Sequence, residues 1–173
     1  FTLQQVVDGI TAKMTRRHPH VFGDQGQRGD GNAQWENIKA AERADRHADT
    51  SALGGVALAL PALLRAEKIQ KRAARTGFDW PDTRGVIDKI NEELDEVRAA
   101  TTAAQQQEEV GDLLFSVVNL ARHLKVDAET ALRGANAKFE RRFRAMEAEA
   151  GTQFADLPLD AKEVLWQQVK RGG

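Results

Sequence analysis

From Leu60 almost to its end, the sequence spaces apolar residues at intervals of three and four, the period of a single buried helix face. Strand-like alternation of β-branched residues is absent. The pattern therefore predicts an all-α fold, a helix bundle. The predicted helices run over residues 2–17, 34–47, 60–76, 83–100, 103–124, 127–150 and 158–171.

The same period predicts which side chains lie in the core. On the helix over residues 103–124, the predicted buried face is Val110, Leu113, Leu114, Val117, Ala121 and Leu124. On the helix over residues 127–150, it is Leu132, Ala135, Phe139, Phe143 and Met146. We also expect the connector at residues 78–81 to bury the aromatic side chains of Phe78 and Trp80.

Composition excludes several classes of function. The formal net charge is -1, so no bulk electrostatic argument supports nucleic-acid binding. The chain has no cysteine, which excludes disulfides, thiolate catalysis and Cys-ligated metal sites. No apolar run approaches the roughly 20 residues of a membrane span. We expect no membrane and no nucleic-acid partner, and a cytoplasmic location.

Two acidic clusters carry the clearest chemistry: Glu92, Glu93 and Glu96, followed by Glu109 and Asp112. They fall on consecutive predicted helices joined by a short link. If those helices are antiparallel, Glu93, Glu96, Glu109 and Asp112 lie together on the flank of the buried stripe. Grouped carboxylates repel one another unless a cation neutralises them, and oxygen ligands select Mg2+, Ca2+ or Mn2+. The alternative is an ordinary solvated surface.

Basic and aromatic residues follow at helical spacing. Lys138 and Arg142 lie one turn apart, as do Trp166 and Lys170. Arg and Lys bind phosphate oxygens, and an aromatic ring can stack on a base. The alternative is an ordinary basic helix face with a core tryptophan. Lys89, one turn before Glu93, could reach a phosphate or pair with a neighbouring carboxylate.

The first fifty residues echo this arrangement. Lys13 and Arg17 are four residues apart, and so are Trp35 and Lys39. No acidic helix pair precedes them. We therefore expect residues 1–50 to be the inactive remnant of a truncated module whose carboxylates would precede Phe1, and residues 51–59 to be a linker. Residues 60–173 are the predicted catalytic domain.

The motif EELDE followed by EEVGD resembles the EExxE…ExxD signature of the all-α nucleoside triphosphate pyrophosphohydrolases. The flanking text is also similar to that family. LPALLRAEKIQKRAARTGFDW, NAKFERRFR and VLWQQVKR look like the C-terminal domain of bacterial MazG, and RRHPHVFGD with WENIKAAER looks like the end of its N-terminal domain. The resemblance covers almost the whole chain.

The resemblance implies a reaction and roles for the residues. Water would attack the α-phosphorus of a nucleoside triphosphate, releasing a nucleoside monophosphate and pyrophosphate, with Mg2+, or Mn2+ in its place, neutralising phosphate charge. The family is typically dimeric, with sites near subunit contacts, so a homodimer is expected. The implied metal ligands are Glu93, Glu96, Glu109 and Asp112, the implied catalytic carboxylates are Glu92 and Glu93, and the implied nucleotide contacts are Lys89, Lys138, Arg142, Trp166 and Lys170.

Two other functions stay open from the residues alone. One is a non-catalytic, nucleotide-binding regulatory helical protein. The other is a purely structural helical dimer. Release of pyrophosphate from a nucleoside triphosphate distinguishes the enzyme from both.

Overall fold

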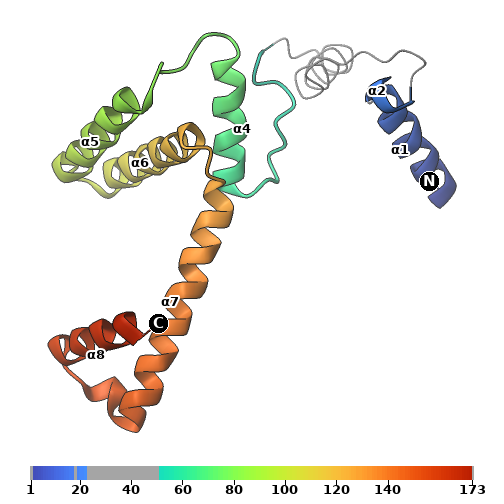
Figure 1. Ribbon diagram of the computed structural model, residues 1–173. Coiled ribbons are helices and arrows are strands. Elements are labelled where there is room, and N and C mark those ends of the chain that lie inside the picture. The colour runs from blue at the N-terminus through green and yellow to red at the C-terminus, as the bar shows by residue number, and fades with distance from the viewer. Residues whose placement is uncertain (1, 18, 23–50, 173) are drawn as a thin grey trace. The chain divides into compact units, whose positions relative to one another are not determined.

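The computed structural model describes residues 2–17, 19–22 and 51–172 (Figure 1). Every regular element in these ranges is helical, which confirms the all-α prediction. The chain divides into two compact units between Val56 and Ala57. The predicted linker at residues 51–59 spans this division. The interpretation of the first unit as a truncated, inactive module stays a prediction.

In the first unit, helix α1 covers Leu3–Arg17 and the short helix α2 covers Pro19–Phe22. The predicted start is confirmed, because the Thr2 hydroxyl accepts a hydrogen bond from the Gln5 backbone N–H at 3.3 Å. The predicted end near His18 is confirmed as well, because α1 ends at Arg17. Pro19 disfavours a helical conformation in the residue before it. The helix predicted at residues 34–47 lies outside the described residues.

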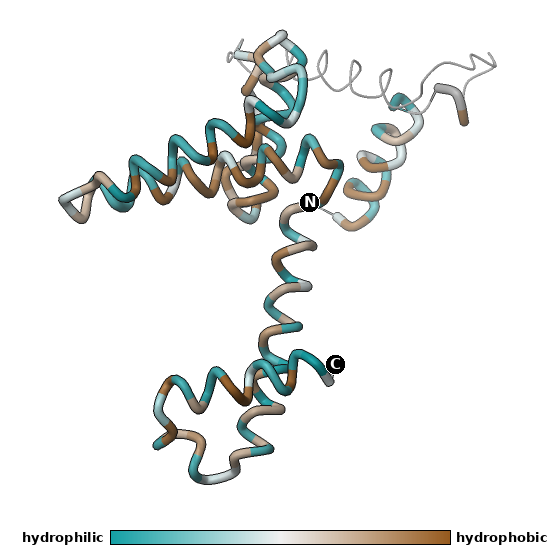
Figure 2. The backbone as a smooth tube through the Cα atoms, turned by 60° about the vertical axis from the view of Figure 1, so that its left-hand side comes forward, coloured by the Kyte–Doolittle hydropathy of each residue, from teal (hydrophilic) through white to brown (hydrophobic). Residues whose placement is uncertain are grey.

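The second unit is built on an antiparallel helix pair, α5 and α6, which lie side by side in both views (Figures 1 and 2). The short link Ala100–Thr102 reverses the chain between them. Helix α4 packs on α6 and on α7, and both α8 and the 3-10 helix η1 pack on α7. The elements are α4 (Ala62–Ala74), α5 (Thr83–Ala99), α6 (Ala103–His123), α7 (Ala128–Ala150), η1 (Gly151–Asp156) and α8 (Leu159–Gly172).

Local sequence signals fix where these helices begin and end. Asp82 and Asp127 cap the starts of α5 and α7 through their side chains. Thr102 and Gln105 form a reciprocal capping box at the start of α6. Gly77, with a φ of 84°, takes the left-handed conformation that follows α4. The register of the α5–α6 pair therefore begins from well-defined caps.

The predicted buried face of α6 is wrong in most positions. Val110, Leu114 and Val117 are 43%, 53% and 46% exposed. The buried side chains of α6 are instead Ser116, Val118 and Asn119. The face that α6 turns towards α4 and α5 carries both polar and apolar side chains. The apolar stripe is therefore left uncovered by the part of the chain that the structure describes.

Helix α7 departs from prediction in the same way. Leu132 and Phe139 remain exposed, and Phe143 is at the border of exposure, whereas Met146 is buried as predicted. Because α7 meets the rest of the unit mainly near its start and carries α8 near its end, much of its apolar face has no neighbour (Figure 1). Figure 2 shows hydrophobic positions recurring along the tube of this unit.

The connector between α4 and α5 also differs from prediction. Phe78 is 80% exposed and Trp80 is 41% exposed, so the expectation that both aromatics are buried is wrong. A polar contact helps to hold the connector: Arg122 at the end of α6 donates to the Asp79 carboxylate. No helix in the described residues is long and apolar enough to cross a membrane.

Candidate metal centre

Three carboxylates from the α5–α6 pair converge in space. Glu93 on α5 and Glu109 and Asp112 on α6 each offer an oxygen atom, and these oxygens all lie within 4.8 Å of one another. Glu109 and Asp112 share a flank of α6 because residues three apart on a helix are neighbours. The convergence results from antiparallel packing, which sets the middle of α5 against the first half of α6.

Glu93 is the most unusual member of this group because its residue is only 3% exposed. Its Oε1 atom lies 2.8 Å from the Lys89 ammonium, whereas its buried Oε2 atom has no hydrogen-bond partner. A buried carboxylate oxygen without a partner is costly. An additional cation beside Oε2 would remove that cost.

The other two acidic positions border this group. Glu96 is exposed and lies outside the three converging carboxylates. Partial desolvation, with the negative charges of Glu93 and Glu109, raises the pKa of Glu96. Glu92 is exposed and lies 2.8 Å from the Lys89 ammonium. The structure thus places Glu96 within electrostatic reach of the group and points Glu92 towards Lys89.

Lys89 is the local counter-charge of the acidic site. Its ammonium is shared between Glu92 and Glu93, and these hydrogen bonds raise its pKa. Of the two roles open from the sequence, pairing with neighbouring carboxylates is the one realised in this structure. One lysine balances only part of the charge of the surrounding acids.

The donor set fits a hard divalent cation. Carboxylate oxygens from Glu93, Glu109 and Asp112 are the ligand type of Mg2+, Ca2+ and Mn2+, and among the residues that the structure describes no sulfur or imidazole joins this group. The partnerless Oε2 of Glu93 gives the fit a second, independent support.

Apart from Lys89, the predicted nucleotide contacts lie elsewhere in the second unit, on α7 and α8. The Trp166 ring on α8 lies 5.5 Å from the Phe139 ring on α7, and the Arg142 guanidinium lies 5.8 Å from the Trp166 ring. Lys138 and Lys170 are exposed on the same two helices. The structure brings the four predicted phosphate and base contacts of α7 and α8 onto one part of the fold, apart from the acidic group on α5 and α6 (Figure 1).

Sequence reasoning missed a polar cluster at the end of the α5–α6 pair that is opposite to the Ala100–Thr102 link. Arg122 donates to Asp79 at 2.9 Å and to Asn119 Oδ1 at 3.0 Å, and His123 Nε2 lies 3.0 Å from Asp79. The hydrogen bond from Arg122, with a smaller one from His123, lowers the pKa of Asp79. The polar stripe Ser116, Asn119 and His123 was the available signal, but the partner in the connector could not be identified from spacing.

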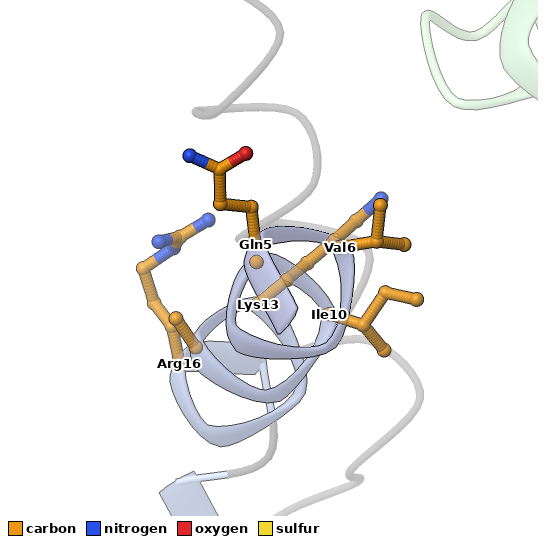
Figure 3. Close-up of a pocket in the computed structure, with 7 residues that line it drawn as sticks. Gln5, Val6, Ile10, Lys13 and Arg16 are labelled. Carbon is orange, nitrogen blue, oxygen red and sulfur yellow. The ribbon is translucent and has the colours of Figure 1, made fainter. Parts of the chain in front are cut away.

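The first unit carries a hollow of about 510 Å3 along α1 (Figure 3). Val6, Ile10 and Lys13 are among its lining residues. Of the echoed residues, Lys13 and Arg17 lie on α1, and Trp35 and Lys39 lie outside the described residues. No group of three or more metal-ligating side chains occurs on α1 or α2.

Comparison with known proteins gives a consistent picture. Residues 83–146 match the family profile described as the MazG nucleotide pyrophosphohydrolase domain. This range includes the acidic residues of both predicted clusters, from Glu92 to Asp112. The nucleoside triphosphate pyrophosphohydrolase of Escherichia coli K12 is 48% identical over 181 residues, covering 99% of this chain and 68% of the relative.

Two further relatives extend this similarity. The nucleoside triphosphate pyrophosphohydrolase/pyrophosphatase MazG of Thermotoga maritima is 43% identical over 175 residues, covering 99% of this chain and 67% of the relative. The uncharacterized protein YabN of Bacillus subtilis is 41% identical over 179 residues, covering 98% of this chain and 36% of the relative.

Proposed function

The chain belongs to the MazG nucleotide pyrophosphohydrolase family, and from this premise we propose that its acidic group hydrolyses nucleoside triphosphates at the α-phosphorus with a bound Mg2+ ion. Family membership makes the chain a nucleoside triphosphate pyrophosphohydrolase. The products are then a nucleoside monophosphate and pyrophosphate. Mn2+ is the alternative ion, since it prefers the same oxygen ligands.

The observation that carries this proposal is the buried Glu93 carboxylate, which has a partnerless Oε2 atom and converges with the carboxylates of Glu109 and Asp112. These three residues would hold the ion. Glu96, whose pKa is raised in part by the negative charges of Glu93 and Glu109, would complete the set. When bound, the ion supplies charge neutralisation at the phosphate oxygens and lowers the pKa of a bound water.

The chain's own groups have further parts in this proposal. Glu92 is exposed beside Lys89 and would accept the proton of the attacking water. Lys89 would turn from the carboxylates to a phosphate oxygen once the metal replaces it as their counter-charge. Lys138, Arg142 and Lys170 would hold phosphates, and Trp166 would stack on the base.

We further propose that the enzyme is a homodimer. The uncovered stripe Val110, Leu114 and Val117 on α6 is accompanied by exposed Leu132 and Phe139 on α7. Exposed apolar faces of this kind are typical of surfaces that associate. We take a second copy of this chain as the partner of these faces, because an identical chain is available wherever the protein is present.

The test follows both the products and the position of attack. The protein is mixed with Mg2+ and each nucleoside triphosphate in 18O-labelled water, and pyrophosphate and monophosphate are measured. Attack at the α-phosphorus puts the label in the monophosphate, whereas attack at the β-phosphorus puts it in pyrophosphate. We expect label in the monophosphate and a loss of turnover of at least about 100-fold in Glu93→Gln.

The matched control is Glu108→Gln, an exposed carboxylate beside Glu109 on α6. It should turn over nucleotide like the wild type. Absence of pyrophosphate with every nucleotide would contradict the proposed activity, and nucleotide binding without turnover would favour the regulatory alternative.

A further inference from the structure

Lys89 contacts the most buried carboxylate of the acidic group. Its ammonium lies 2.8 Å from Glu93 Oε1 and 2.8 Å from Glu92 Oε1. The side chain of Glu93 is 4% exposed, whereas that of Glu92 is 57% exposed. Water and salt screen the contact with Glu93 much less than the contact with Glu92. The electrostatic attraction of Lys89 is therefore directed mainly at Glu93.

The Lys89–Glu93 contact is local to α5. The two residues are four apart, so Lys89 lies one helical turn before Glu93 on the same flank. This contact needs no other element and can form as soon as α5 is helical. The three converging carboxylates, by contrast, come together only when α5 packs on α6. The fold thus supplies Glu93 with a cation of its own.

The ammonium of Lys89 keeps its charge. The hydrogen bonds to Glu92 and Glu93 raise the pKa of Lys89, so the group stays protonated at neutral pH. A divalent cation held by Glu93 would therefore lie beside a second positive charge on the same carboxylate. Because like charges repel at such short range, Lys89 and a metal ion compete for Glu93.

Lys89 can give up this contact without a change in the backbone. Its side chain is 34% exposed, and the ammonium is carried on a flexible four-carbon stem. A phosphate oxygen is a suitable new partner, since ammonium and phosphate form a charge-assisted hydrogen bond. A nucleoside triphosphate would thus compensate Lys89 for the loss of Glu93.

We propose that Lys89 is an internal counter-ion that neutralises Glu93 until a nucleoside triphosphate binds, so that the site binds its metal ion and its nucleotide cooperatively. This inference rests on the proposed function and adds a condition to it: the protein binds the metal ion weakly as long as no nucleotide is bound. Coupling between two ligands is reciprocal, so the metal ion also strengthens the binding of the nucleotide.

A second cation on α5 provides a matched control. Arg98 lies 2.6 Å from Asp95, and both side chains are about three-quarters exposed. Asp95 does not belong to the three converging carboxylates. Arg98 therefore carries the same charge on the same helix, but its printed partner is not a proposed metal ligand. Removing its charge tests whether any cation near the acids has the effect proposed for Lys89.

The first measurement is the affinity of the full chain for Mg2+ without nucleotide, by calorimetry. Lys89→Met keeps a flexible side chain and removes the charge. We expect it to bind Mg2+ at least about 10-fold more tightly than the wild type, because the competing charge is gone. Arg98→Met should stay within about twofold of the wild type, since solvent screens that pair. Unchanged or weaker Mg2+ binding by Lys89→Met would overturn the proposal.

The second measurement is the affinity for an α,β-methylene nucleoside triphosphate, which resists cleavage at the α-phosphorus, in saturating Mg2+. We expect Lys89→Met to bind this analogue about 10-fold more weakly than the wild type, because it lacks the ammonium–phosphate contact. Lys89→Arg keeps the charge and should keep both affinities near those of the wild type. Tighter Mg2+ binding together with unchanged affinity for the analogue would refute the transfer of Lys89 to phosphate, and with it the coupling.

The two measurements separate this inference from the proposed function. A wild type that binds no Mg2+, with or without the analogue, contradicts the metal site and the proposed function together. A wild type that binds Mg2+ and releases pyrophosphate, but whose Mg2+ affinity is unaffected by Lys89→Met, contradicts only the counter-ion role. Lys89→Gln, whose amide can still donate to Glu93, replaces Lys89→Met if that variant does not fold.

Discussion

At the residue scale, Glu93 carries most of the chemical argument. Its side chain is buried on a helix whose other carboxylates are largely solvated, and it keeps one oxygen without a partner. Such an arrangement costs folding free energy unless something outside the chain compensates it. A role in binding a metal ion would explain why a carboxylate stands at this position despite the cost of burying it.

Glu93→Gln should have opposite effects on stability without and with metal. In chelator, the amide can still accept from Lys89 through its oxygen and can donate to Glu109 or Asp112 through its nitrogen. The free energy of unfolding should then rise by about 1 kcal/mol. In Mg2+ at about 100 times Kd, the wild type should gain about 2.7 kcal/mol, and the variant should lose most of this gain.

Urea unfolding in chelator and in Mg2+ measures both effects. Glu108→Gln, which is exposed on α6, should keep the full Mg2+-dependent gain. A Glu93→Gln protein that is stabilised by Mg2+ as strongly as the wild type would exclude Glu93 as a ligand.

At the element scale, the connector between α4 and α5 decides how the helix pair is held. Asp79 joins the connector to Arg122 and His123 at the end of α6, and Trp80 packs against Gly85 in the first turn of α5. Both contacts lie at the end of the pair that is opposite to the Ala100–Thr102 link. The α5–α6 pair is therefore held by the link at one end and by these contacts at the other. The carboxylates of the acidic group lie between the two ends.

Asp79→Asn should reveal a pH-dependent contribution to stability. Arg122 lowers the pKa of Asp79, so the contribution is present above the ordinary value of 3.8 and is lost as pH falls through the lowered value in the folded state. At neutral pH we expect the variant to lose about 2 kcal/mol, since the carboxylate bonds a charged partner. In acid, below both pKa values, the difference should vanish.

Unfolding free energies from pH 7 down into the acid range check this dependence. Asp95→Asn is the matched control, because the Asp95–Arg98 pair on α5 is about three-quarters exposed on both sides. Exposed pairs contribute about 0–1 kcal/mol, so its effect should be small at every pH. A loss from Asp79→Asn that does not change with pH would contradict the ion-pair explanation.

Gly85→Ala should disturb the contact between the connector and α5. A Cβ atom at this position would lie 2.2 Å from Trp80 Cδ1, so the indole must move. Overpacking costs about 1–3 kcal/mol, and the helix preference of alanine offsets about 1 kcal/mol of it. We expect a net loss of stability together with a changed Trp80 fluorescence.

Gly134→Ala on α7 is the comparison, because no atom lies within 4 Å of its Cβ position. Alanine there should stabilise the helix by about 1 kcal/mol. Equal effects of the two substitutions on unfolding would mean that Trp80 does not pack on Gly85 in solution.

At the scale of the whole molecule, the second unit contains every residue of the proposed site. Its internal contacts form one compact unit from Ala57 onwards. The acidic group and the Arg142–Trp166 contact of α7 and α8 both belong to it. The first unit contributes none of the proposed ligands or phosphate contacts.

A fragment of residues 57–173 should therefore fold and turn over nucleotide. We expect a helical circular-dichroism spectrum, a cooperative unfolding transition and Mg2+-dependent pyrophosphate release with the same kcat as the full chain. The reason is that the proposed metal ligands, the caps of their helices, and helices α7 and α8 are all retained. A folded fragment without turnover would show that residues 1–56 take part in the site, which would contradict their predicted inactivity.

The sequence by itself determined the helices and the chemistry of the site. Caps such as Asp82 and Asp127 act within one helical turn, so local spacing was sufficient to place the helix starts. The spacing of Glu109 and Asp112 likewise placed both on one flank of α6, and antiparallel pairing with α5 followed from the short link. These features depend on neighbours in the chain.

Only the tertiary structure decided what each helix buries. Val110 and Phe139 satisfy the helical period of a core position, yet both are exposed, because a period identifies an apolar face without identifying what covers it. For the same reason, helical spacing could not predict the Asp79–Arg122 contact, whose partners are far apart in sequence. Nor could local spacing predict that the end of α7, with α8, lies apart from the acidic group (Figure 1), since long-range packing sets the direction in which α7 leaves α6.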